Sequence, residues 1–283
     1  MKKKRLSVIL PILLILIGYY ILMFPIVSNL LNSIFNLNSI SNYSTALSGY
    51  TDDELDKMLE NCRKYNEQLA EYQKTHVFHY QGSSATDDTY KNLPMSGDIG
   101  SLEIPKINVD VVISHGTKDN ELRSGAGHLY GTSLPVDGES VHAVIAAHSA
   151  LSTAELFTHL NKLEKGDKFY VTVLDKKYEY KVDQITVCLP EEDYEYEQII
   201  EGRNYVTLYT CTPYGVNDHR LLVRGEFTGS VKTADLSNGN TMYQVGRIIW
   251  TSAKFALVIL GPFIAAVTYG IVTDNKRRRK KKC

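Results

Sequence analysis

The chain has few cysteines, a single tryptophan and none of the short motifs that usually mark metal or nucleotide sites. Its 283 residues contain four cysteines, and no Cys-x-x-Cys, His-x-x-x-His or His-Glu-x-x-His pattern occurs. These absences argue against a zinc centre. The glycine-rich nucleotide fingerprint, the phosphate-binding loop and Gly-x-Ser-x-Gly are also missing, which argues against a nucleotide cofactor and a serine hydrolase. We therefore predict no cofactor and no metal.

Positive charge is scarce in the middle of the chain. Residues 31–246 contain 18 lysines and arginines against 31 aspartates and glutamates, a net charge of −13. An acidic body repels phosphate, so nucleic acid is not an expected partner. Most of the remaining basic residues gather at the two ends, in residues 2–5 and 276–282.

Two stretches have no charged residue at all, and each lies beside one of these basic ends. Leu6–Ile26 has 21 residues and Phe255–Val272 has 18, lengths that suit a helix across the ~30 Å hydrocarbon layer. Because lysine and arginine flank membrane spans on the cytoplasmic side, we expect both termini in the cytoplasm. The middle of the chain is then expected on the extracellular face of the cell membrane, with membrane lipid as a partner.

The first stretch has an alternative interpretation as a cleaved signal peptide. Its apolar run is longer than is usual for such a signal, and no clear cleavage site follows within residues 28–39. Both points favour an uncleaved anchor.

Between the two spans the pattern changes from helical to strand-forming. Residues 51–74 carry apolar residues at helical spacing and begin with a capping box, Thr51 and Glu54. A loop of 18 residues follows at 81–98. Short runs of β-formers then recur, as in "HAVIAAHS", "KFYVTVL" and "YVTLYTC", with short helical pieces expected at "AELFTHLNKL" and "EQIIEG". About eight such strands predict a closed barrel rather than an open sheet.

The predicted fold class is therefore mainly β. We expect a closed eight-stranded barrel with short helices, an N-terminal helical segment and a transmembrane helix at each end. The expected divisions are a basic tail with the first anchor or signal (1–30), a helical region with the long loop (31–96), the barrel (97–229), a linker (230–246), and the second span with its basic tail (247–283).

One cysteine stands where reactive groups are often presented. Cys211 ends a predicted strand and precedes the turn "TPYG". With Cys62 and Cys188 it makes three extracellular cysteines, an odd number, so at least one thiol is unpaired within the chain. Cys188 lies in the apolar strand "QITVCLP" and is predicted to be a core residue, whereas Cys62 lies in a polar helical pattern. His148 also ends a strand, and an imidazole or arginine beside a thiol can hold it as the reactive thiolate.

The sequence around Cys211 reads "TLYTCTPYGVNDHRLLVRG", and upstream of it stand "GSLEIPKINVDVVISHGT", "GAGHLYGTSLPV", "AAHSAL" and "LFTHLNKLEKGDKFYV". These motifs resemble those of the sortases, and within them of the class C branch that polymerises pilins. The first is similar to the family's TLxTC motif with its following arginine. The resemblance covers about residues 97–227. It implies a catalytic cysteine at Cys211, a catalytic histidine at His148 and a catalytic arginine at Arg220. Arg224 is the competitor because it has the same side-chain parity on the strand, but the family's arginine precedes the Leu-Leu-Val run, which favours Arg220.

The resemblance also implies a reaction and its partners. A class C sortase cleaves an LPxTG-like sorting signal between threonine and glycine, forms a thioester on its cysteine and transfers the acyl group to a lysine of another pilin subunit. The implied partners are pilin subunits that carry the signal and an acceptor lysine. Three alternatives remain: a housekeeping sortase that attaches surface proteins to peptidoglycan, a cysteine protease, and a non-enzymatic membrane-tethered binding module.

One family feature is missing from the long loop. Class C sortases commonly cover the active site with a lid that carries an Asp-Pro-aromatic motif, and "KTHVFHYQGSSATDD" contains none. Phe78 or Tyr80 could supply the aromatic ring, and neither Asp87 nor Asp88 is favoured as the acidic group. We expect a lid held weakly by an aromatic contact, and the alternative is a plain flexible linker.

Overall fold

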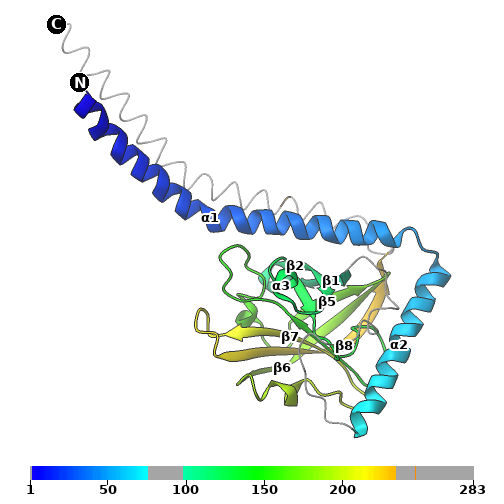
Figure 1. Ribbon diagram of the computed structural model, residues 1–283. Coiled ribbons are helices and arrows are strands. Elements are labelled where there is room, and N and C mark those ends of the chain that lie inside the picture. The colour runs from blue at the N-terminus through cyan, green and yellow to red at the C-terminus, as the bar shows by residue number, and fades with distance from the viewer. Residues whose placement is uncertain (1, 76–97, 234–245, 247–283) are drawn as a thin grey trace. The chain divides into compact units, whose positions relative to one another are not determined.

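The chain folds into a closed β-barrel preceded by two helices (Figure 1). The structure, a computed structural model, describes residues 2–75, 98–233 and 246. The barrel strands close in the order β1-β2-β3-β4-β7-β8-β6-β5, which confirms the predicted eight-stranded barrel. Their bounds are β1 Asp98–Ile104, β2 Val109–His115, β3 Ala126–His128, β4 Val141–Ala146, β5 Lys168–Val173, β6 Lys176–Cys188, β7 Asn204–Thr212 and β8 His219–Lys232.

The strands present alternate residues to the inside and the outside of the barrel. On β7, Val206 and Leu208 are fully buried in the core. Because side chains along a strand alternate between faces, Tyr209 and Cys211 point outward. The pairs β2 with β3 and β4 with β7 are parallel, and the other neighbours are antiparallel. The parallel pairing of β4 with β7 brings the C-terminal ends of these two strands together.

Helix α2, Asp52–Thr75, confirms the helix expected after the capping box. The Thr51 amide donates to Glu54 Oε2 at 2.8 Å, and the Glu54 amide donates to Thr51 Oγ1 at 3.3 Å. The buried side of the helix packs Leu55 and Cys62 into the barrel's core cluster. Burial raises the pKa of the Cys62 thiol to about 12, so this cysteine is a packing residue.

Helix α1, Lys2–Leu47, is a single long helix that includes the N-terminal apolar stretch. Within the part of the chain that the structure describes, one helical segment, Ile17–Leu47, is long and apolar enough to cross a membrane by length and composition. The expected second span, Phe255–Val272, lies outside the described residues.

Two asparagines attach α1 to the barrel. Asn36 is fully buried, its Nδ2 donates to the Ser124 carbonyl at 2.6 Å, and its Oδ1 accepts from the Val112 amide at 3.0 Å. Asn32, one helical turn earlier, donates to the same Ser124 carbonyl at 3.2 Å. The end of α1 that leads away from the apolar stretch is therefore bound directly to β2 and to the loop before β3.

A short helix predicted at residues 154–163 does not form. The only helical winding there is the 3₁₀ helix η3, Leu160–Lys162. Leu156, within this stretch, has φ +36°, outside the right-handed helical range, and this interrupts an α-helix. The buried residues of the stretch are Ala154, Leu156, Phe157, Leu160 and Leu163.

Two further details differ from the sequence-based expectation. The helical turn expected at "EQIIEG" falls just before it, in the 3₁₀ helix η4, Asp193–Tyr196. The strand count of eight includes β3, a three-residue strand that a glycine-rich sequence does not signal.

The remaining short elements are η2 Pro105–Ile107 and α3 Asp119–Leu122.

Candidate active site

Cys211 lies on the outward face of β7, next to the end of that strand. Pro213 follows the strand and has no amide hydrogen for a sheet ladder. Gly215 has φ +78°, a conformation that glycine adopts readily, and it allows the chain to turn back into β8. Cys211 is partly exposed and forms no disulfide, whereas Tyr214 and Val216 of the turn are largely exposed.

Arg220 lies directly opposite Cys211 in the antiparallel register of β7 and β8. Its partner on the other side, on β6, is Cys188. Directly opposed residues point to the same face of a sheet, so the Arg220 side chain lies between the two cysteines. Cys188 is buried as predicted, but on this outward face rather than in the barrel core. Burial and nearby carboxylates raise the pKa of its thiol to about 11, which leaves it largely protonated near neutral pH.

Three hydrogen bonds hold the guanidinium of Arg220. Nε donates to the Tyr209 hydroxyl at 2.8 Å, and Nη1 donates to the carbonyls of Asn217 and His219 at 3.2 and 3.1 Å. Partial burial acts against the charge, but Tyr209 and Cys211 raise the pKa of Arg220 above its ordinary value. The structure therefore places a fixed positive charge beside the Cys211 thiol.

His148 follows β4, and the backbone around it is bonded to the end of β7. The Ala147 amide donates to the Tyr209 carbonyl at 3.1 Å, and Ser149 Oγ donates to the Cys211 carbonyl at 2.7 Å. These bonds bring His148 to the same end of β7 as Cys211, as the strand-end pattern predicts.

Two neighbouring segments support His148. Its Nε2 lies 3.7 Å from Asp119 Oδ1, at the start of α3. Its carbonyl accepts a hydrogen bond from the Phe157 amide at 3.1 Å. Nearby in the same loop, the Glu155 amide donates to Asn29 Oδ1 of α1 at 3.0 Å. The loop after His148 is therefore joined both to the histidine and to the long N-terminal helix.

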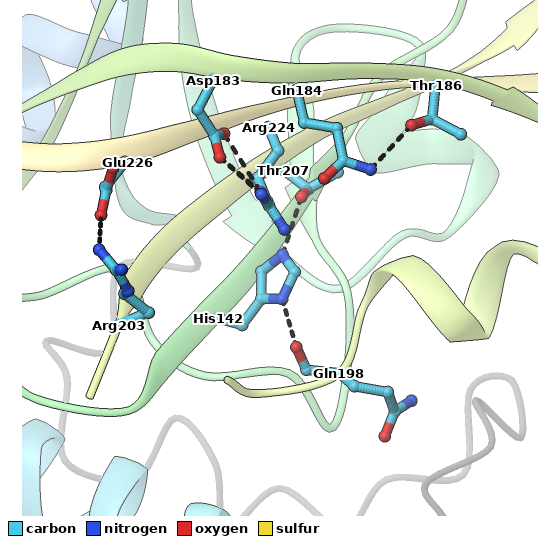
Figure 2. A network of polar contacts seen from close by, with 9 residues as sticks. All are labelled: His142, Asp183, Gln184, Thr186, Gln198, Arg203, Thr207, Arg224 and Glu226. Carbon is cyan, nitrogen blue, oxygen red and sulfur yellow. Dashed lines mark hydrogen bonds and ion pairs between the residues drawn. The ribbon is translucent and has the colours of Figure 1, made fainter. Parts of the chain in front are cut away.

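The competing arginine, Arg224, is engaged elsewhere on the same face (Figure 2). It lies opposite Thr207, farther from the end of β7 than Cys211. Its Nε and Nη2 donate to Asp183 at 3.1 and 2.5 Å, and its guanidinium lies 4.1 Å from the ring centre of Tyr205. These contacts hold Arg224 in an ion pair away from the thiol.

Another histidine, His142, anchors the segment between β6 and β7 (Figure 2). His142 is buried, and burial lowers its pKa to about 4, so the ring is neutral. Because a carbonyl can only accept, Nδ1 donates to the Gln198 carbonyl at 2.7 Å. Nε2 then accepts from the Thr207 hydroxyl at 2.8 Å. With both nitrogens occupied, His142 is a structural residue rather than a candidate base.

A small hollow of about 40 Å³ lies beside the thiol. Cys211, Ser149, Phe157 and Tyr214 contribute to its lining. A thiol with an imidazole and a fixed cation nearby can carry out acyl transfer through a thioester. Within the described ranges, no group of three His, Cys, Asp or Glu residues could hold a metal ion.

The expected lid residues and two residues near Arg220 remain to be compared with the sequence-based prediction. Phe78 and Tyr80, expected as lid residues, lie outside the described part of the chain. Tyr209 and Asp193 were missed from the sequence. Strand parity alone could have placed Tyr209 on the face of Cys211, whereas nothing in the sequence shows where the segment carrying Asp193 lies.

Comparison with known proteins identifies relatives of the barrel. The family described as "Sortase domain" matches residues 102–228. Sortase A of Streptococcus agalactiae serotype III (strain NEM316) is 32% identical over 155 residues, which cover 52% of this chain and 59% of that protein. Sortase A of Bacillus anthracis is 26% identical over 134 residues, covering 47% and 60%. The chain thus spans about three fifths of the length of these curated relatives.

Solved structures match over a larger part of the chain. The structure titled "Sortase C1 of GBS Pilus Island 1" has a TM-score of 0.63 and 39% identity, covering 69% of this chain and 93% of its own. Sortase C of Streptococcus pneumoniae has a TM-score of 0.61 and 39% identity, with coverages of 67% and 96%. Sortase C from Clostridium perfringens SM101 has a TM-score of 0.58 and 40% identity, with coverages of 68% and 99%.

Proposed function

The chain belongs to the sortase family of cysteine transpeptidases, and from this premise we propose that it polymerises pilins at the cell surface. The observation that carries the proposal is the register of β7 and β8, which sets Arg220 directly opposite Cys211. Similarity to sortase C structures, one of them named for a pilus island and another titled for pilin substrate specificity, supports pilins as the substrate class.

The first half of the proposed reaction forms a thioester. The Cys211 thiolate attacks the carbonyl carbon of threonine in an LPxTG-like sorting signal. The tetrahedral intermediate collapses, the carbon–nitrogen bond to glycine breaks, and the departing amine takes a proton from His148.

In the second half, a lysine amine of another pilin subunit attacks the thioester carbon. The carbon–sulfur bond breaks, the thiolate of Cys211 is restored, and His148 accepts the proton that the attacking amine loses. An isopeptide bond then joins the two subunits.

Arg220 stabilises the negative charge that develops on the carbonyl oxygen in both halves. Its Nε and Nη1 are bound within the protein, so Nη2 is the nitrogen that faces the substrate in this proposal. A fixed donor of this kind typically lowers the barrier by ~2.7–4 kcal/mol.

The proposed location is the extracellular face of the cell membrane. An acidic middle region between two apolar stretches with basic flanks supports this orientation, with both termini in the cytoplasm if the first stretch is not cleaved. Protease accessibility in intact cells tests it, because the barrel should be cleaved and the termini protected.

A second candidate function is attachment of surface proteins to peptidoglycan, because relatives named sortase A also match the chain. The acceptor separates the two functions. The acyl-enzyme is offered a pilin-derived lysine peptide or a peptidoglycan-type amine in parallel, and the proposal expects faster transfer to the lysine peptide.

Mass spectrometry tests the covalent step. Incubation with an LPxTG-type peptide should give an acyl adduct on Cys211, and Cys211→Ala should abolish both adduct and transfer while the protein remains folded. A variant that still joins pilin subunits would show that another residue is the nucleophile. Release of free acid without any amine acceptor would instead indicate a cysteine protease.

A further inference from the structure

Two of the three nitrogens of the Arg220 guanidinium are bound within the protein. Nε and Nη1 donate to a hydroxyl and two backbone carbonyls, all within 3.2 Å. Nη2 has no hydrogen-bond partner among the residues that the structure describes. Because the guanidinium is planar and rigid, the groups that hold Nε and Nη1 also set the direction in which Nη2 points.

The hydroxyl of Tyr209 has a defined orientation in this arrangement. It donates its single proton to Asp193 Oδ2 at 2.6 Å, so a lone pair is left to accept from Arg220 Nε. Burial, together with the hydrogen bond to Asp193, raises the pKa of Tyr209 well above its usual range, and the hydroxyl stays neutral. Without the carboxylate, the Tyr209 hydroxyl would lose the acceptor of its proton, and with it the group that fixes its rotation.

Asp193 is held in place by the segment between β6 and β7. This segment begins with the Glu192 carboxylate accepting from the Leu189 amide at 3.2 Å. Five residues after Asp193, the Gln198 carbonyl accepts from His142 Nδ1 of β4 at 2.7 Å, and this bond attaches the segment to the barrel (Figure 2). Bonds on both sides of Asp193 therefore keep its carboxylate over the outward face of β7.

We propose that Tyr209 is a positioning residue for Arg220, and that Asp193 fixes the Tyr209 hydroxyl in the accepting orientation. The relay Asp193–Tyr209–Arg220 holds Nη2 ready for the substrate oxygen before any substrate arrives. The inference rests on the proposed function, since it assigns a supporting pair to the arginine of that same site. It adds Asp193 to the site, so the segment between β6 and β7 contributes to the geometry of the catalytic arginine.

The test compares Tyr209→Phe with Tyr205→Phe in the full-length protein in detergent. Both changes remove one hydroxyl from the same face of β7, but Tyr205 lies beside Arg224 rather than Arg220. Thioester formation with an LPxTG-type peptide should slow about tenfold in Tyr209→Phe, the loss expected for one hydrogen bond to a charged group, with KM little changed. Tyr205→Phe should stay within about twofold of wild type.

Two further variants separate positioning from a general structural effect. Asp193→Ala should reproduce the Tyr209→Phe defect, and the double variant should be no slower than either single one, because both act through one hydroxyl. In an Arg220→Ala background, Tyr209→Phe should have no further effect. An equal slowing in that background would overturn the inference, since Tyr209 would then act independently of the arginine.

A spectroscopic measurement needs no substrate and keeps the inference separate from the proposed function. In protein labelled with ¹⁵N-arginine, the Nε–H resonance of Arg220 should shift and exchange faster in Tyr209→Phe and Asp193→Ala but not in Tyr205→Phe. Unchanged resonances would overturn the positioning role, and so would shifted resonances with an unchanged rate. If the resonances behave as expected but wild-type protein never forms a thioester, the proposed sorting-signal substrate is wrong, whereas the contact between Tyr209 and Arg220 is confirmed.

Discussion

Replacing Arg220 by lysine tests whether the guanidinium fork, rather than charge alone, is needed at the site. Lysine keeps a positive charge but has one nitrogen in place of three. It cannot bind the Tyr209 hydroxyl and the two turn carbonyls while also presenting a donor to substrate. The change therefore removes the orientation of the donor and keeps most of the electrostatic attraction.

The expected magnitude follows from the role of an oriented donor. Complete loss of one such donor typically slows the reaction by about 10²–10³. Because lysine retains the charge, we expect Arg220→Lys to lower the rate of thioester formation by more than about tenfold and less than the full loss. KM should change little, since the donor acts mainly on charge that develops in the transition state.

The assay is single-turnover thioester formation, followed by quenching and intact-mass analysis, with Arg224→Lys as the matched control. Arg224 lies on the same face of β8, but its donors bind Asp183. Arg224→Lys should keep nearly full activity and lose about 1 kcal/mol of stability or less, since this ion pair is partly exposed. An active Arg220→Lys together with an impaired Arg224→Lys would refute the assignment and move the catalytic arginine to Arg224.

Thiol reagents, stability curves and helix variants provide three further tests. At pH 7.5, peptide mapping after brief treatment with iodoacetamide should find Cys211 modified and Cys188 unmodified, because burial raises the pKa of Cys188 to about 11; equal labelling would contradict this. Burial also raises the pKa of Glu197 from 4.5 to about 8, so the folded state keeps a proton there that the unfolded state loses. Stability should therefore fall as pH rises from about 4.5 to 8. Glu197→Gln should flatten this fall in melting curves, and an unchanged slope would argue against it. Asn36→Leu leaves the buried Val112 amide without its acceptor and removes one of two bonds to the Ser124 carbonyl, so it should cost about 1–3 kcal/mol. Exposed Asn38→Leu should be nearly neutral in denaturant titrations, and equal losses would contradict the docking contact.

The barrel could be predicted because its strands carry local signals. Alternation of β-formers and turn residues marked β7 and β8, and the capping box marked the start of α2. The three-residue β3 has no such signal, since a short glycine-rich strand is formed by pairing with its neighbours rather than by its own residues. The helix predicted at 154–163 does not form because Leu156 has φ +36°, a conformation that the apolar pattern of the stretch does not signal.

Some residues of the candidate site could likewise be predicted from the sequence, and others could not. Strand ends and the family resemblance pointed to Cys211, His148 and Arg220, whose elements the structure brings together. The partners of Arg220 could not be read from the sequence, because Asp193 reaches Tyr209 only through the path of the segment between β6 and β7. A contact between distant segments depends on the tertiary fold, and neither motif nor periodicity reports it.

The attachment of α1 has a consequence for how the thiol is presented to its surroundings. The helix runs from Lys2 to Leu47 with no loop between the apolar stretch and the asparagines that bind the barrel. Under the proposed membrane anchoring, the barrel cannot rotate about the helix axis independently of the membrane span. One residue inserted after Val27 would turn Cys211 by about 100° around that axis, whereas seven would restore its direction to within about 20°. The continuous helix thus fixes the direction in which Cys211 faces relative to the membrane span. A flexible tether of equal length would not fix it.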